Sequence, residues 1–450
     1  MVSCRVACRF VRTAAFMLAL VVPAVVFGQG GVIVEADGVL RLIRFDDPNG
    51  ALHKQRVAAA RAALDQKIGR ASKLRKVSLT ALEAEIGKSL AENRQLSDAM
   101  KNLAGLTRVQ YVFFYPETKE IVLTGPAEGW VEDRAGRVVG IETGRPTLLL
   151  EDLIVALRAY GPSQSKGPVI SVSIDPTQEG LRDMQQFLMS LGGVRPSDAP
   201  RIVDGLKTSL GLQKVSIRGV SPRTHFAQVL VEADYRMKMI GIGLENPGVG
   251  IVSYVAKANP AAVAQNALKR WYFVPNYKCV KMSEDGLAAE LVGDGVKLVG
   301  ADEVVAADGT RRAAGQEDAA STAFTKSFTE KYGKLAARLP VYGQLRNCID
   351  LAIVAAHLRQ SGIADQAEWQ MPIFGSEEKL PAETRHSPVQ VETAVNAVWK
   401  GNRLTTPVGG GVNIQAHKAL EAPLADTDGA LKEKRYTTKP QLAPGQWWWD

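Results

Sequence analysis

Two aspartates occupy positions where carboxylates often do chemistry in mixed α/β proteins. Asp175 follows an apolar run that predicts a strand over residues 169–174, and Asp234 lies in an otherwise apolar stretch. Such a pair could supply the acid and base of a hydrolase, as in many glycosidases. Asp175 also precedes Pro176 and a helical pattern, so its preferred interpretation is a helix N-cap. We therefore assign no catalytic residue.

A polar cluster surrounds the second aspartate. Asp234, Tyr235 and Arg236 follow one another within apolar surroundings, with Lys238 close behind. These side chains could contact a ligand, but a buried ion pair or the flank of a helix explains them without one. We keep the three residues as binding candidates beside that structural interpretation.

Spacing argues against a standard metal site or nucleotide site. No two of the histidines stand at metal-binding spacing, and no second cysteine lies near either Cys279 or Cys348. There is no nucleophile elbow around a serine and no phosphate-binding loop. We expect no metal and no cofactor.

The positive charge is concentrated in one segment. The net charge is +8, and residues 53–76 hold eight of the basic residues against a single acidic one. An anionic lipid, a polysaccharide or another anionic polymer could bind there, through Lys54, Arg56 and Arg61. The segment lacks the interleaved aromatic residues that single-strand binders use, so no nucleic acid is expected. A solvated helix face is the simpler interpretation.

The chain ends in Trp447, Trp448, Trp449 and Asp450. Exposed indoles are costly unless they meet a partner, and tryptophan is enriched at interaction hot spots. Two interpretations stay open: a docking tail, and an end without fixed structure.

The first 28 residues have the pattern of an export signal. Arg5, Arg9 and Arg12 precede an apolar run over residues 13–27, and Gly28 suits a cleavage site before Gln29. We expect a periplasmic or secreted mature chain that has no transmembrane segment. Outside the cytoplasm, two leftover cysteines favour pairing, so Cys279 and Cys348 are disulfide candidates, with two buried thiols as the alternative.

The elements that position these residues predict an α/β or α+β fold, with mixed sheet regions, packed helices, a β-meander and a C-terminal helical pair. We expect an opening hairpin over residues 32–44, a strand over 228–232 that leads into a helix over 234–240, a meander over 271–308, and paired helices near 324–339 and 345–355. The chain divides into a leader (1–28), an N-terminal α/β region with a basic helix (29–160), a central α/β region (161–310), a helix-rich region (311–420) and a flexible tail (421–450).

Five segments together carry a resemblance. They are residues 173–181, 231–243, 270–277, 324–332 and 340–347. The chain resembles an uncharacterised family of exported proteins from planctomycete-type bacteria, over about residues 100 to 420. The resemblance implies export and a shared fold, and it carries over no catalytic residue.

From these observations we expect an exported, non-enzymatic binding or structural protein of the cell envelope. Its partner would be an envelope component, either a protein or an anionic polymer. The alternative is a periplasmic or secreted hydrolase that uses carboxylates, with Asp175 and Asp234 as the first candidates.

Overall fold

The computed structural model describes residues 29–45, 47, 50–161, 169–192, 195–258, 267–301, 303–305, 311–313, 319–396 and 408–450. The predicted leader lies outside these residues.

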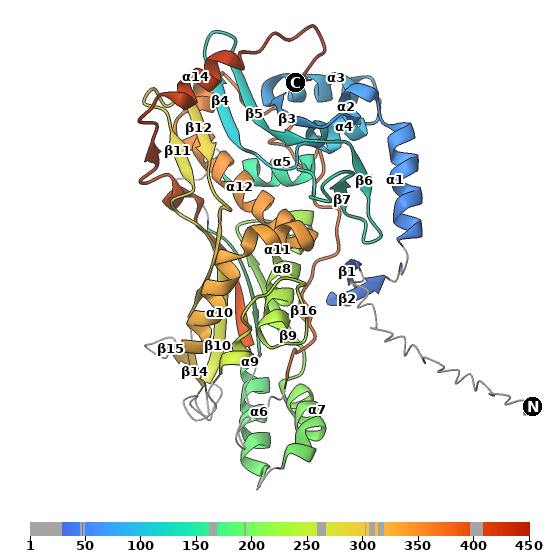
Figure 1. Ribbon diagram of the computed structural model, residues 1–450, viewed down its shortest axis with the longest axis vertical. Coiled ribbons are helices and arrows are strands. Elements are labelled where there is room, and N and C mark those ends of the chain that lie inside the picture. Colours follow the sequence, from blue (N-terminus) through green and yellow to red (C-terminus); the bar gives the residue numbers. More distant parts are fainter. Residues whose placement is uncertain are drawn as a thin grey trace, which may run out of the picture.

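A ten-stranded mixed sheet forms the lower half of the molecule (Figure 1). Its strand order is β1-β2-β16-β9-β8-β17-β10-β14-β15, with β13 also paired to β10. The opening hairpin is confirmed as β1 and β2, which pair antiparallel. The strands are β1 (Gln29–Val34), β2 (Val39–Phe45), β8 (Ile170–Asp175), β9 (Gln213–Arg218), β10 (Ala267–Pro275), β13 (Val296–Gly300), β14 (Glu303–Val305), β15 (Arg311–Ala313), β16 (Gln390–Val391) and β17 (Val408–Ile414).

A seven-stranded sheet forms the upper half, in the order β18-β11-β12-β4-β5-β3-β19. Its strands are β3 (Ser72–Ser78), β4 (Tyr111–Tyr115), β5 (Glu120–Ala127), β11 (Val280–Met282), β12 (Ala288–Leu291), β18 (Leu424–Ala425) and β19 (Trp448–Trp449). The predicted meander is divided between the two sheets, because β10 and β13 pair in the lower one and β11 and β12 in the upper one. A separate pair consists of β6 (Trp130–Glu132) and β7 (Val138–Gly140).

Helices fill the space between the sheets. Helix α8 (His225–Gly241) packs on β8 and β17, and α12 (Pro340–Gln360) packs against α5 (Leu150–Ala159), α8 and α11 (Tyr332–Arg338). The predicted strand over residues 228–232 is wrong, since α8 is one continuous helix. Nearly all of its residues are buried, so its apolar pattern lacks the one-sided period that marks a surface helix.

The remaining helices cover the sheets or extend from them. They are α1 (Ala51–Ala63), α2 (Gln66–Gly69), α3 (Leu79–Ala91), α4 (Asp98–Lys101), α6 (Gln178–Ser190), α7 (Ala199–Leu210), α9 (Tyr254–Lys257), α10 (Ala319–Glu330), α13 (Ile363–Gln366) and α14 (Ala430–Thr437). The pair α6 and α7 forms the lower tip of the molecule, around a small apolar core of its own. The N-cap of α6 is Thr177, whose hydroxyl accepts from the N–H of Gly180 at 3.0 Å, so the cap predicted at Asp175 is wrong.

The C-terminal segment has regular structure where the sequence predicted a flexible tail. Residues 421–450 contribute β18, α14 and β19, and β19 pairs antiparallel with β3 at the edge of the upper sheet. The backbone N–H of Ser78 donates to the Trp447 carbonyl at 2.9 Å. Hydrogen bonding to an existing strand satisfies backbone groups that a loose tail would leave to water.

The predicted fold class is confirmed as α+β, with mixed sheets and packed helices. One apolar core joins the two halves, with members as distant in sequence as Leu40, Phe226, Ile349 and Trp447. No helix among the described residues is both long and apolar enough to cross a membrane.

Candidate functional site

A cavity of about 1130 Å³ lies between the arm made by α1 and α2 and the helices α5 and α8. Residues of β6, β7 and the C-terminal strand β19 also line it, as do residues of α4 and of the segment 380–385. Two smaller hollows are also present. One, of about 240 Å³, adjoins the first cavity at Leu64 and Asp65, and the other, of about 210 Å³, lies between α5 and α12. Only the first has the size and the mixed lining of a site for an organic ligand.

Most of the cavity wall is apolar. Two tryptophans contribute to it from different elements, Trp130 from β6 and Trp448 from β19. Helices α5 and α8 add buried aliphatic side chains, and α1 presents two alanines, so the apolar lining includes Leu150, Ile154, Val229, Ala60 and Ala63.

A histidine and an aspartate meet at the wall of this cavity. His225 is the first residue of α8, and the Thr224 hydroxyl caps that helix by accepting from the N–H of Ala227. The His225 Nδ1 lies 2.9 Å from Oδ2 of Asp152, which belongs to the first turn of α5. Burial lowers the pKa of His225, but the Asp152 carboxylate outweighs it, so the pKa is raised overall.

A chain of hydrogen bonds continues from the histidine. Gln344 Nε2 lies 3.3 Å from His225 Nε2, and Gln344 Oε1 accepts from Arg137 Nε at 3.1 Å. This arrangement places the lone pair of His225 Nε2 toward the amide and its proton on Nδ1, toward Asp152. Arg137 also pairs with Glu232 at 2.5 Å. This part of the wall is therefore an ordered polar strip from His225 to Glu232, and Asp152 supports it from outside the lining.

The hydrogen-bond network extends through Glu232 and its arginine partners to strand β1. The Glu232 Oε1 accepts from Arg137 and, at 3.2 Å, from Arg236, which also pairs with Glu245 at 2.6 Å. Burial lowers the pKa of Arg236, but Glu245 and Glu232 outweigh it and raise the pKa overall. Arg137 also donates to the Gly30 carbonyl at 2.6 Å, which fixes β1 against the network.

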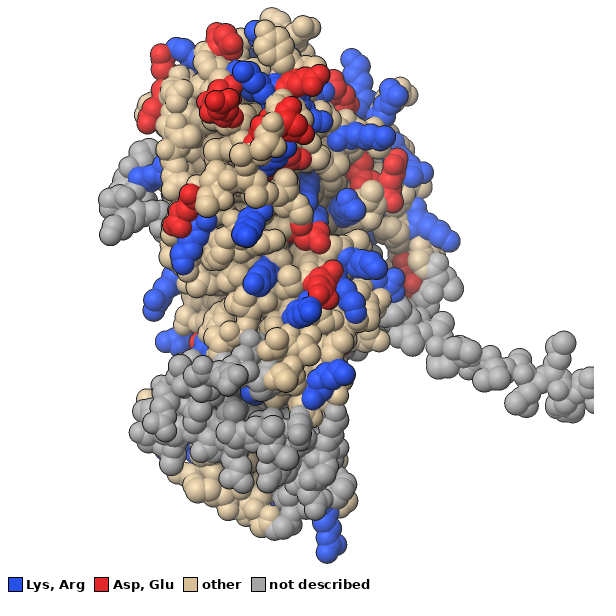
Figure 2. Space-filling model, turned by 60° about the vertical axis from the view of Figure 1, so that its left-hand side comes forward, with Lys and Arg blue, Asp and Glu red and all other residues tan. Residues whose placement is uncertain are grey.

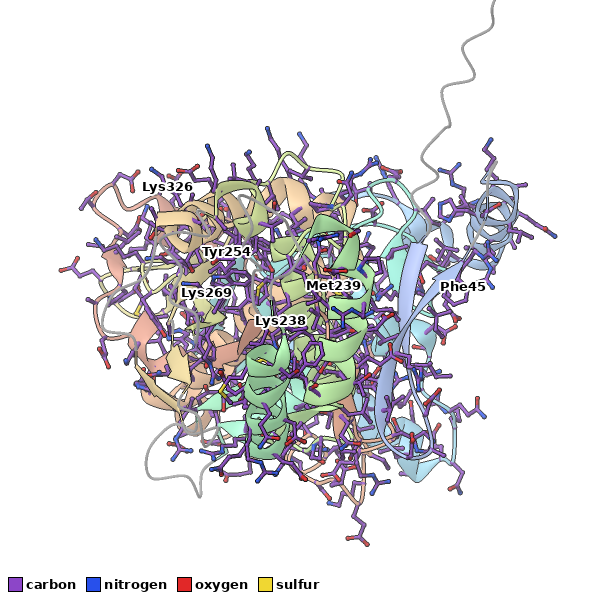
Figure 3. All side chains as sticks on the ribbon, turned by 90° about the horizontal axis from the view of Figure 1, so that it is seen from below. Phe45, Lys238, Met239, Tyr254, Lys269 and Lys326 are labelled. Atoms are coloured by element: carbon purple, nitrogen blue, oxygen red, sulfur yellow. The ribbon has the colours of Figure 1, made fainter. Side chains whose placement is uncertain are left out.

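The opposite end of α8 carries a buried ion pair. Lys238 Nζ lies 2.9 Å from Asp234 Oδ2 and donates to the Ile174 carbonyl at 2.9 Å. Both side chains are almost completely inaccessible. Burial raises the pKa of Asp234 to about 6, against the effect of Lys238, and lowers the pKa of Lys238. In Figure 3, Tyr254 and Lys269 are labelled on one side of Lys238 and Met239 on the other.

The predicted binding cluster is thus divided among different partners. Asp234 faces Lys238, and Arg236 faces the acidic residues of the network. Tyr235 is buried, and burial raises its pKa to about 12. Arg236 contacts a residue that lines the cavity, whereas Asp234 and Tyr235 are not among the lining residues.

The two aspartates of the hydrolase alternative each have a basic partner. Asp175 lies 2.8 Å from Arg270 Nη2, and Asp234 is paired with Lys238. Neither carboxylate lines the cavity. The structure therefore gives this pair no access to a ligand in the cavity.

The basic residues of segment 53–76 lie in two different environments, one exposed and one buried. Lys54, Arg56 and Arg61 lie exposed on α1, where Arg56 also donates to the Asp133 carbonyl at 2.9 Å. Arg75, from the same segment, is completely buried in β3. Figure 2 shows one face of the molecule on which Lys and Arg are interspersed with Asp and Glu over the upper part. That face does not present a continuous basic surface.

The terminal tryptophans lie in the fold. Trp447 is buried, and Trp448 and Trp449 are half-buried. The guanidinium of Arg75 lies 4.9 Å from the centre of the Trp448 ring and makes two hydrogen bonds of 3.0 Å to the Asp450 carboxylate. Trp448 thereby forms part of the cavity wall.

The predicted disulfide is wrong, and the alternative of two buried thiols describes the structure. Cys279 and Cys348 are both free and almost completely buried. Burial raises the pKa of Cys279 to about 12 and that of Cys348 well above its ordinary value. Both thiols stay protonated and act as small apolar side chains. Within the described residues, no three His, Cys, Asp or Glu side chains come together as a metal site.

Sequence reasoning missed the centre of the site. His225 and Asp152 are 73 positions apart, and Gln344 and Arg137 lie still further from each other. The local signal was Thr224, a capping residue directly before His225, which predicts that a helix begins there. No pattern within the chain predicts which carboxylate that histidine meets.

A family of proteins of unknown function, DUF1598, matches residues 172–254. The match covers less than a fifth of the chain, from β8 to the start of α9, and includes both ends of α8. It supports a domain of unknown function, as the resemblance implied. No curated protein and no solved structure matches the chain.

Proposed function

We propose that the protein is an exported, non-enzymatic binding protein of the cell envelope, and that its ligand occupies the cavity between α1 and α8. The observation that carries the proposal is the cavity itself, at about 1130 Å³, with a mostly apolar wall that also holds polar and charged side chains, among them the strip from His225 to Glu232. Binding sites for organic ligands have this composition, with a few placed polar groups among apolar ones.

The two surfaces that the sequence indicated both border this cavity. Helix α1 presents Ala60 and Ala63 to it, and the C-terminal strand presents Trp448. On α1, Lys54 and Arg61 lie exposed and stay available for an anionic polymer of the envelope. Helix α1 therefore presents alanines to the ligand site and basic side chains to the outer surface.

Filling the cavity tests the binding role. Ala60 lines the cavity, whereas Ala59, its neighbour on α1, is exposed and does not. We expect the protein purified from its own cells to carry a bound molecule, detected by mass spectrometry after denaturation. Ala60→Phe removes that molecule and Ala59→Phe retains it. A molecule retained equally by both variants would place binding outside the cavity.

Export is tested separately, at the N-terminus. The leader pattern predicts a mature chain that begins at Gln29. Peptide sequencing of protein from fractionated cells is expected to give that terminus in the periplasmic or secreted fraction. A chain that retains Met1 and is recovered with the cytosol would contradict the envelope assignment.

A second candidate function is hydrolysis in the same cavity. The observation that favours it is the contact between Asp152 and His225, because a carboxylate at Nδ1 orients an imidazole whose Nε2 can act as a general base once water replaces the Gln344 amide there. Uncharged ester substrates test it. We expect no turnover from the native protein above that of His225→Gln. Turnover that His225→Gln abolishes would favour the hydrolase.

A further inference from the structure

We infer that the ligand of this cavity is an uncharged molecule with a long aliphatic body and a hydroxyl-type head group. The inference rests on the proposed function and adds the chemical class of the ligand. It follows from the lining, from the state of each basic residue in the wall and from the position of the polar strip.

Aliphatic and aromatic side chains from several helices and strands face the cavity. Helix α5 contributes Leu150 and Ile154, α8 contributes Val229, and the tryptophans come from β6 and β19. Transfer of each methylene of a ligand from water to such a wall is favourable by about 0.8 kcal/mol. A cavity of about 1130 Å³ has room for a ligand with a long chain.

The basic residues of the wall are already paired. The three that line the cavity are Lys101, Arg137 and Arg385. Their carboxylate partners are Asp98 at 3.2 Å, Glu232 at 2.5 Å and Glu151 at 3.0 Å, respectively.

The side chains of Lys101 and Arg385 are 55% and 42% exposed, whereas Arg137 and Glu232 are at most 8% exposed. At the polar strip, an anionic head group would therefore have to displace Glu232 or remain buried without a counter-charge. Burial of an unpaired carboxylate is strongly unfavourable. The strip therefore discriminates against a carboxylate or phosphate head group and accepts an uncharged one.

The polar strip can hold an uncharged head group. His225, Gln344, Arg137 and Glu232 line the cavity and are hydrogen-bonded to one another. A hydroxyl both donates and accepts, so it can join such a strip without leaving a charge unpaired. The apolar body then lies along α5 and α8, and the head group lies at the strip.

Two probes with the same chain length separate the classes. Decan-1-ol and decanoate differ only in the head group, and each is titrated against the protein loaded with the uncharged dye Nile red. We expect decan-1-ol to displace the dye with an apparent Kd at least about tenfold lower than that of decanoate. Ala60→Phe is expected to raise the apparent Kd for decan-1-ol at least about tenfold, whereas Ala59→Phe leaves that Kd unchanged. Circular dichroism and the urea midpoint confirm that both variants are folded.

The contrary outcomes distinguish this inference from the proposed function. Tighter displacement by decanoate, or a co-purifying molecule that is water-soluble and is absent from Ala60→Phe, overturns the ligand class and leaves the binding role intact. Failure of Nile red and both probes to bind, together with no co-purifying molecule, overturns both. If Ala60→Phe and Ala59→Phe weaken the binding of decan-1-ol equally, the cavity is not its binding site.

Discussion

The first turn of α8 borders the cavity, whereas its last turns lie buried against the lower sheet. Each of these two regions carries a basic residue beside a carboxylate. His225 meets Asp152 at the start of the helix, and the His225 side chain is 15% exposed. Lys238 meets Asp234 near the end, where the exposed fraction of both side chains is at most 2%. The same pairing therefore occurs in two environments on one helix.

The comparison teaches that burial decides what such a pair can do. At the buried end, both groups depend on each other, because a single charge left without its partner would be very costly. At the cavity end, the imidazole has a second nitrogen, and its partner Gln344 continues into a network that borders open space. The buried pair can fix α8 on the sheet, while the cavity pair can exchange protons and meet a ligand.

The largest expected effect is the loss of the buried cation. Lys238→Met leaves the Asp234 carboxylate inside the protein without its counter-charge, so we expect a loss of about 3–5 kcal/mol in the free energy of unfolding. Urea denaturation measures it. The double variant Asp234→Leu with Lys238→Met removes both charges and is expected to recover most of the loss. Equal destabilisation by the single and double variants would contradict a coupled pair.

A smaller loss is expected in the middle of the helix. Glu232→Gln removes the charge that Arg137 and Arg236 share, and charge-assisted hydrogen bonds contribute about 1.5–3 kcal/mol. We expect a loss of about 2 kcal/mol by urea denaturation, because Glu245 still neutralises Arg236. Destabilisation greater than that of Lys238→Met would reverse the order of the two regions.

At the cavity end of α8, we expect the stability of the fold to depend on pH through His225. The pKa of His225 is raised in the folded protein, so protonation stabilises the fold. That stabilisation is complete below the unfolded pKa of about 6.5 and is lost as the pH rises through the folded pKa. Urea midpoints between pH 6 and 9 are expected to fall for the native protein and to flatten in His225→Asn. A native midpoint that rises over this range would contradict the raised pKa.

The smallest effect is a change in titration alone. Gln344→Glu places a carboxylate 3.3 Å from His225 Nε2 at the position of the present amide, so we expect the pKa of His225 to rise further. Histidine resonances in an NMR titration report it directly. Gln228→Glu is the control, because the Gln228 amide donates to the His386 carbonyl instead. A shift as large in the control would show a general charge effect rather than a contact through Gln344.

Local pattern predicted many elements and misjudged others for one physical reason. The hairpin of β1 and β2 alternates around an Asp-Gly turn, which the chain encodes within a few residues. Helix α8 is buried on nearly all sides, so its apolar run resembles a buried strand over residues 228–232. In the sequence, the terminal tryptophans resemble a free tail, because the strand β3 with which they pair is far away in the chain.

The sequence by itself determined that helices and strands are mixed in an α/β or α+β fold, that the chain opens with a hairpin and that positive charge is concentrated near α1, because each depends on neighbouring residues. Only the tertiary structure decided that Cys279 and Cys348 are separate thiols, that Trp448 borders a cavity, and that His225 faces Asp152. Those outcomes depend on the packing of α5, α8, α12 and β19, whose contacts join positions up to hundreds of residues apart. Periodicity describes the face of one element, and a site forms where the faces of several elements meet.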